Sequence, residues 1–140
     1  MVSVSSFAEF DCDIKYVWQA VTSLTDYSWR SGLKKIVVGK DNKQFEEHTK
    51  DGFVTRFKIT KFKPYDCYEF DMENDNLTGR WRGKFIFSGG RTFVEFTEEA
   101  SAKKFYIKPL LRAYLKSQQK IYIADLKKKL EKYSHRRNKK

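Results

Sequence analysis

A long run of strand-like sequence that leads into one helical segment constrains this fold most. From Phe53 to Thr97, apolar and polar residues alternate between turn residues, which is the pattern of half-buried β-strands. Between Pro109 and Tyr133, apolar residues recur three, four or seven positions apart, which indicates one amphipathic helix. Those helical residues are Leu111, Leu115, Tyr122, Leu126 and Leu130. We therefore expect a curved antiparallel sheet that closes on a single C-terminal helix, which is a container shape.

The two adjacent glycines at 89 and 90 mark a hairpin whose register can be predicted. A two-residue turn there pairs Ser88 with Arg91 and Phe85 with Val94. This register gathers large apolar side chains on one face and basic side chains on the other, as in a sheet with a single covered side. The apolar set is Trp81, Phe85, Phe87, Val94 and Phe96.

A second hairpin is expected around Asp51-Gly52, and two registers remain open for it. With a two-residue turn, Glu46 and His48 point into the container, where such a pair could perform acid–base chemistry. With a bulge, Phe45 and Glu47 point inward and His48 faces solvent. Phe45 suits an inward position better, so the bulge is the favoured interpretation.

The N-terminal third predicts one strand followed by short helices. Val2–Phe10 is expected to form the first strand, and either Asp11 or Asp13 can cap the helix after it. Thr25–Ser31 is expected to form a second short helix or a turn. A further strand is predicted over 33–39.

Charge is distributed unevenly along the chain. The last forty residues hold 14 of the 29 Lys and Arg but only two of the 18 acidic residues, so they carry +12 and the rest carries −1. We expect residues 1–133 to form one domain and residues 134–140 a basic flexible tail. Such a tail can contact nucleic acid or an anionic membrane. No RNA-binding motif or aromatic stacking platform accompanies it, so both partners are disfavoured.

Cysteine and histidine usage gives no indication of a cofactor. Cys12 and Cys67 are the only cysteines, and the N-terminus lacks an apolar signal segment, so we expect a cytoplasmic protein with two reduced thiols. His48 and His135 lie far apart, and neither a CxxC nor an HxxxH spacing occurs. We therefore expect no metal and no cofactor.

Several short motifs follow one another along nearly the whole chain. They are Val17-Trp18, the TDYSW segment at 25–29, Gly90-Arg91-Thr92, and the DLKKKLE segment at 125–131. Their order resembles the START-like, or helix-grip, superfamily, which includes polyketide cyclase/dehydrase and lipid-transport proteins. The resemblance implies an α+β fold in which about seven curved antiparallel strands wrap on a long C-terminal helix, with two short helices after the first strand. It also implies a hydrophobic cavity, but it does not imply one activity.

Two adjacent amides interrupt the apolar stripe of the C-terminal helix between Leu115 and Tyr122. An amide on the sheet side must be hydrogen-bonded, so Gln118 is expected either to orient a ligand or to satisfy a core group. In the second case, Gln119 is expected to be exposed. Tyr122, one turn further on, offers a hydroxyl beside them.

These patterns together predict the binding of a small hydrophobic or aromatic molecule in an internal cavity, without catalysis. A cyclase- or aromatase-like enzyme is the first alternative, and a surface-binding protein that uses the basic C-terminus is the second. Aromatic residues make up 16% of the chain, and their rigid rings leave concave space. The two tryptophans at 29 and 81 suit either a pocket or the core. The expected lining is Trp29, Phe57, Ile59, Tyr68, Phe70, Trp81, Phe85, Val94, Leu115, Gln118 and Tyr122.

Overall fold

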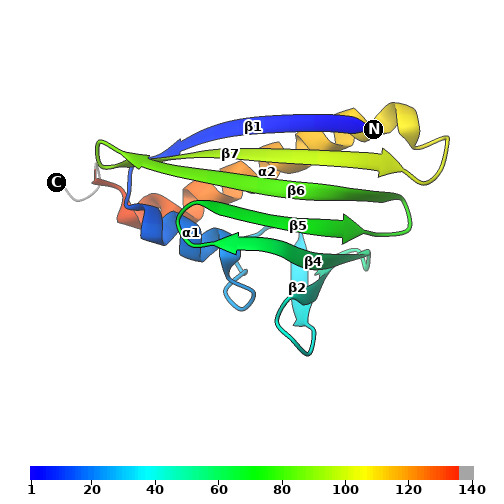
Figure 1. The fold of residues 1–140 in the computed structure, drawn as a ribbon, viewed down its shortest axis with the longest axis horizontal. Coiled ribbons are helices and arrows are strands. Elements are labelled where there is room, and N and C mark those ends of the chain that lie inside the picture. Colours follow the sequence, from blue (N-terminus) through cyan, green and yellow to red (C-terminus); the bar gives the residue numbers. More distant parts are fainter. Residues whose placement is uncertain (136–140) are drawn as a thin grey trace.

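The computed structural model describes residues 1–135 and contains one seven-stranded antiparallel sheet with a long helix across one face (Figure 1). The strands lie in the order β1-β7-β6-β5-β4-β3-β2. Their bounds are β1 (Val2–Phe10), β2 (Leu33–Val38), β3 (Gln44–Thr49), β4 (Val54–Lys63), β5 (Cys67–Glu73), β6 (Leu77–Ser88) and β7 (Arg91–Ala102). The predicted α+β architecture of about seven curved strands and a long C-terminal helix is confirmed.

The helices lie at the two ends of the chain. Helix α1 (Ile14–Thr22) follows β1, and Asp13 caps it by accepting a hydrogen bond from the Lys15 amide (2.9 Å). Helix α2 (Leu111–Leu130) is flanked by single 3-10 turns at Lys108–Leu110 and Glu131–Tyr133. Within residues 1–135, no helix has both the length and the apolar character needed to cross a bilayer.

Of the helix or turn expected at residues 25–31, the structure has the turn, so the second short helix implied by the family resemblance is wrong. The Ser23 hydroxyl accepts a hydrogen bond from the Asp26 amide (3.0 Å), and the Trp29 indole donates to the Asp26 carbonyl (3.1 Å). These local bonds compete with a helix, and so short a helix would not offset the cost of its first turn.

The Gly89-Gly90 hairpin has the predicted register. Phe85 pairs with Val94 and Ser88 with Arg91, and both glycines have positive φ angles of 61° and 78°, as the tightest hairpin turns require. Phe87 shares the inward parity but is 45% exposed, since it lies close to the hairpin tip.

The hairpin between β3 and β4 has the bulged register that was favoured. Its loop holds three residues, 50–52, and Gly52 takes a φ of 88°. Phe45 therefore pairs with Phe57, and Glu47 pairs with Thr55. The alternative register, with Glu46 and His48 in the cavity, is wrong.

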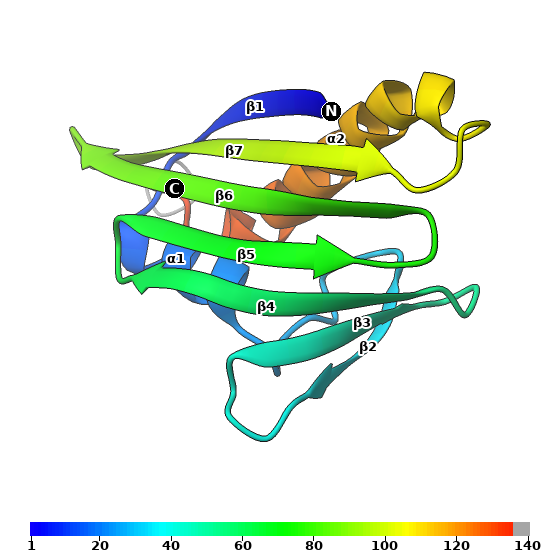
Figure 2. The ribbon, with the colours of Figure 1, turned by 45° about the vertical axis from the view of Figure 1, so that its right-hand side comes forward.

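Helix α2 covers only part of the sheet, and this positions the site. It packs mainly on β1, β7 and α1, and Figure 2 shows it running behind that part of the sheet. The strands β2 to β4 curl away from it on the other side. One core cluster, with Val17 and Leu126, joins α1 to the C-terminal half of α2, and another, with Val4 and Leu111, lies under its N-terminal half.

The start of the predicted basic tail contacts the domain. The Ser134 hydroxyl donates a hydrogen bond to the Asp11 carboxylate (3.1 Å), and the His135 amide donates to the Asp11 carbonyl (3.0 Å). The His135 ring nitrogen Nε2 lies 3.1 Å from the Gly90 carbonyl oxygen. The remainder of that prediction, on residues 136–140, lies outside the described residues.

Candidate functional site

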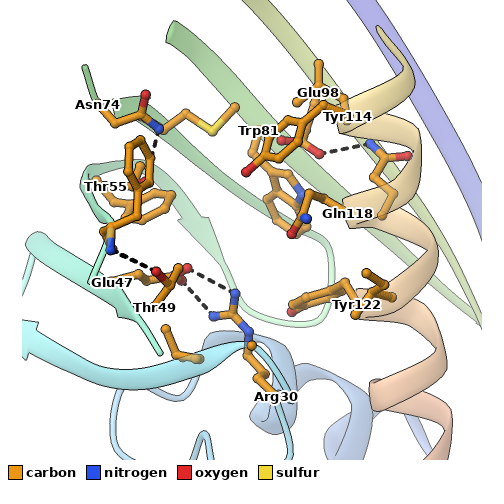
Figure 3. A pocket seen from close by; sticks show the side chains of 18 of the residues that line it. Arg30, Glu47, Thr49, Thr55, Asn74, Trp81, Glu98, Tyr114, Gln118 and Tyr122 are labelled. Atoms are coloured by element: carbon orange, nitrogen blue, oxygen red, sulfur yellow. Dashed lines mark hydrogen bonds and ion pairs between the residues drawn. The ribbon is translucent and has the colours of Figure 1, made fainter. Parts of the chain in front are cut away.

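A cavity of about 840 Å³ lies between the inner face of the sheet and α2 (Figure 3). Its size falls in the range of pockets that hold drug-sized molecules. Most of the predicted lining is found on its wall: Phe57, Tyr68, Phe70, Trp81, Leu115, Gln118 and Tyr122.

Four predicted lining residues are not on the cavity wall: Trp29, Ile59, Phe85 and Val94. Phe85 instead packs edge-on against Trp18 of α1, with ring centres 4.9 Å apart. Trp29 packs edge-on against Tyr122, with ring centres 5.5 Å apart. Strand parity placed Phe85 and Val94 on the correct face, but α1 fills the space over that end of β6 and β7.

The floor of the cavity is a row of five aromatic rings, one from each of the adjacent strands β3 to β7. Phe45 stacks on Phe57 (4.9 Å), which meets Phe70 edge-on (5.0 Å). Phe70 stacks on Trp81 (4.9 Å), which stacks on Phe96 (5.1 Å). Because these pairs are close to ideal stacking and edge contacts, the row is a rigid apolar surface.

A half-buried ion pair forms one polar wall of the cavity. Arg30, from the loop before β2, donates two hydrogen bonds to Glu47 of β3, at 2.7 and 3.0 Å. The guanidinium carbon of Arg30 also lies 5.3 Å from the ring centre of Tyr122, within cation–π range. Burial raises the pKa of the Tyr122 and Tyr68 hydroxyls, so both phenols stay protonated and able to donate at neutral pH.

A second polar group, Glu98 of β7, lies on the wall near α2. The Gln119 amide nitrogen donates to Glu98 Oε1 (3.2 Å) and to the Val4 carbonyl (3.1 Å), while the Ser6 hydroxyl donates to the Gln119 oxygen. Burial, with a smaller contribution from Glu47, raises the pKa of Glu98 to about 7 despite the Gln119 hydrogen bond. The carboxyl is thus a group that changes charge near neutral pH.

The expectation that Gln119 is exposed is wrong, since its side chain is 3% exposed and hydrogen-bonded to β1 and β7. Both amides line the cavity, and Gln118 is the exposed one. The spacing contained this signal, because 119 lies four residues after Leu115 and seven before Leu126.

Sequence reasoning also missed Arg30, Glu98 and Tyr114 as lining residues. Alternate residues of β7 share a face, and Val94 and Phe96 point inward, so Glu98 could have been predicted on the same face. Arg30 lies in a turn with no periodicity, so no pattern indicated it.

Burial of the Glu98 carboxyl should make stability depend on pH. The folded-state pKa of about 7 lies above the ordinary 4.5, so the contribution of this group is complete below about pH 4.5 and is lost as pH rises through 7. Relative to Glu98→Gln, the wild type should lose about 2–3 kcal/mol of unfolding free energy between roughly pH 5 and pH 9. Urea denaturation at the two pH values measures this.

Glu99→Gln, on the outward face of the same strand, is the matched control and should keep the pH dependence of the wild type. Parallel pH profiles for wild type and Glu98→Gln would contradict the prediction, since Glu98 would then titrate as an exposed carboxyl does.

No group of three or more metal-ligating side chains occurs within residues 1–135. Cys12 and Cys67 are buried free thiols. Burial, together with Asp11 and Asp13, raises the pKa of Cys12 to about 11, so this thiol stays protonated at neutral pH. The His48 Nε2 and Glu46 Oε1 atoms lie 3.1 Å apart. Neither residue lines the cavity.

The fold and cavity define a START-like, helix-grip protein. Solved structures that share this fold include a conserved protein from Geobacillus kaustophilus, which is 12% identical with a TM-score of 0.78 over 96% of this chain and 98% of that one. A START superfamily protein from Mycobacterium smegmatis is 12% identical with a TM-score of 0.79 (93% and 97%). An aromatase/cyclase from a Streptomyces species is 10% identical with a TM-score of 0.76 (93% of each chain).

A family model described as polyketide cyclase/dehydrase and lipid transport matches residues 1–131. The chain therefore belongs to this family. No curated protein matched the sequence. The family assignment and the shared fold support a ligand-binding scaffold. Because a fold alone does not define a function, the function of this chain is argued from the residues of its cavity.

Proposed function

We propose that this protein binds a small hydrophobic or aromatic molecule in the cavity, for transport or sensing. The observation that carries the proposal is the row of five aromatic rings along a cavity of about 840 Å³. A rigid, mostly apolar pocket with a few placed polar groups is typical of small-molecule sites. Flat ligands gain most from it, because they can stack on the rings.

Filling the cavity should weaken ligand binding without unfolding the protein. Ile36 of β2 lines the cavity and is only partly buried, so Ile36→Trp places an indole in the ligand's space. We expect it to weaken the binding of the neutral fluorescent probe N-phenylnaphthylamine by roughly tenfold or more. Fluorescence titration of the probe measures the affinity, and native mass spectrometry of the purified wild type tests for a retained ligand.

Val37→Trp is the matched control for this experiment. Val37 is the next residue of β2, is 43% exposed and does not line the cavity. The control should bind the probe as the wild type does. Equal binding by both tryptophan variants would place the probe outside the cavity and remove the support for the proposal.

Glu98 favours a cyclase- or aromatase-like enzyme as a second candidate. Its pKa of about 7 suits a general acid or base at neutral pH, and it faces the same cavity. Turnover of a polyketide-like substrate by the wild type but not by Glu98→Gln, followed by mass spectrometry of the products, would replace the binding proposal with this one.

A further inference from the structure

We propose that the cavity selects an uncharged ligand with a hydroxyl or carbonyl group at one end, and that Glu47 excludes carboxylates by neutralising Arg30. This inference rests on the proposed function and specifies the class of ligand. It starts from the position of the ion pair. Glu47 lies two residues after Phe45 on the same face of β3, so the Arg30–Glu47 pair stands at one end of the aromatic row.

Arg30 and Glu47 hold each other in place and neutralise each other's charge before any ligand binds. Its two hydrogen bonds are the paired type that fixes a guanidinium against a carboxylate. The side chains of Arg30 and Glu47 are only 24% and 18% exposed. A largely desolvated arginine without a partner would be destabilising, and Glu47 supplies that partner.

Arg30 nevertheless keeps donors for a ligand. Within residues 1–135 its guanidinium donates hydrogen bonds to Glu47 alone, and a guanidinium has more N–H groups than these two bonds use. Figure 3 shows Tyr122 projecting from α2 toward the same place. A neutral oxygen acceptor can therefore be hydrogen-bonded there while the body of the ligand lies on the rings.

The charged groups around the cavity give no net attraction for an anion. Among residues 1–135, two cations and four carboxyl groups line it. Carboxylates still outnumber cations there when Glu98 is protonated. Asp125 is already engaged by the backbone amide and hydroxyl of Ser31, at 2.9 and 2.8 Å. The lining charges are Arg30, Lys50, Glu47, Asp51, Glu98 and Asp125.

A carboxylate seated beside Arg30 loses its hydration without gaining an unpaired cation there, because Glu47 already pairs with Arg30. The other lining cation, Lys50, is exposed in the loop between β3 and β4. The transfer of a carboxylate from water to the side of Arg30 is costly, whereas a hydroxyl or carbonyl needs only one or two hydrogen bonds to offset its own desolvation. Neutralisation of the Arg30 charge by Glu47 is thus what makes the cavity prefer hydroxyl or carbonyl ligands over carboxylates.

The test compares three molecules of one shape: methylnaphthalene, naphthol and naphthoate. We expect wild type to bind naphthol at least roughly tenfold more tightly than naphthoate near neutral pH. In Glu47→Gln the Arg30 charge is no longer compensated, so naphthoate should bind roughly tenfold more tightly than it does to wild type, and the preference should shrink or invert. Isothermal titration calorimetry measures all three affinities.

Two further variants separate selectivity from damage to the fold. Arg30→Met/Glu47→Met removes both charges, and replacing a buried pair by apolar residues is usually tolerated. It should bind methylnaphthalene as wild type does, lose the advantage of naphthol and gain nothing for naphthoate. Glu46→Gln, next to Glu47 but away from the cavity wall, should behave as wild type.

The outcomes distinguish this inference from the proposed function. If methylnaphthalene binds but wild type prefers naphthoate, or if Glu47→Gln leaves naphthoate binding unchanged in a folded protein, the ion pair does not set selectivity and the inference is overturned alone. If none of the three molecules binds wild type, both the inference and the proposed function fail.

Discussion

A chain that ends at Lys108 should not fold cooperatively. It would lack α2, whose four inward leucines at 111, 115, 126 and 130 are each no more than 3% exposed. Burial of one such leucine side chain is worth about 1.5–3 kcal/mol. Losing all four therefore removes an amount comparable to the whole stability of a domain of this size, about 5–15 kcal/mol. Thermal unfolding followed by near-ultraviolet circular dichroism should show no cooperative transition.

A chain that ends at His135 is the matched control, since it retains α2 and its packed side chains. It should melt cooperatively at a temperature close to that of the full chain. If the chain ending at Lys108 also melted cooperatively near that temperature, α2 would be an appendage and not part of the core.

Leu126→Ala should lower the free energy of unfolding by about 2–5 kcal/mol. The Leu126 side chain has no exposed surface and packs in the cluster formed with Val17 and Trp18 of α1, so its removal leaves a cavity that rigid rings nearby cannot close. Urea denaturation measures the loss. Leu126 does not line the ligand cavity, so the folded variant should still bind the probe.

Lys127→Ala is the control for this substitution, because Lys127 is the next residue of α2 and is exposed. It should change stability by no more than about 0.5 kcal/mol. A loss at Leu126 no larger than that at Lys127 would mean that the two helices do not pack as described.

The aromatic floor was predictable because strands alternate and hairpin turns set the register. The glycines at 89 and 90 determine that Phe85 faces Val94, and parity then carries Trp81 and Phe96 to the same side. The same reasoning left the β3–β4 register open, since a loop of two or three residues fits Asp51-Gly52 equally well in sequence. The inward preference of Phe45 decided it correctly.

The polar side of the cavity was mostly beyond prediction. Arg30 lies in a turn, and its contact with Glu47 depends on how residues 25–31 cross the open side of the sheet. Glu47 and Glu98 could be placed on a face by parity, but parity does not say whether a carboxyl at that face meets a partner, a ligand or water. Their pairing depends on the tertiary arrangement.

The sequence by itself determined the class of fold, the register of the β6–β7 hairpin and the inward faces of its strands, because local periodicity and turn geometry act over a few residues. Only the tertiary structure decided which part of the inward face became cavity. Helix α1 covers Phe85 and Val94 at one end, whereas α2 lies over β1 and β7 and leaves Phe57 and Phe70 facing open space. Packing between segments that are distant in the chain sets that boundary, and no short-range pattern encodes it.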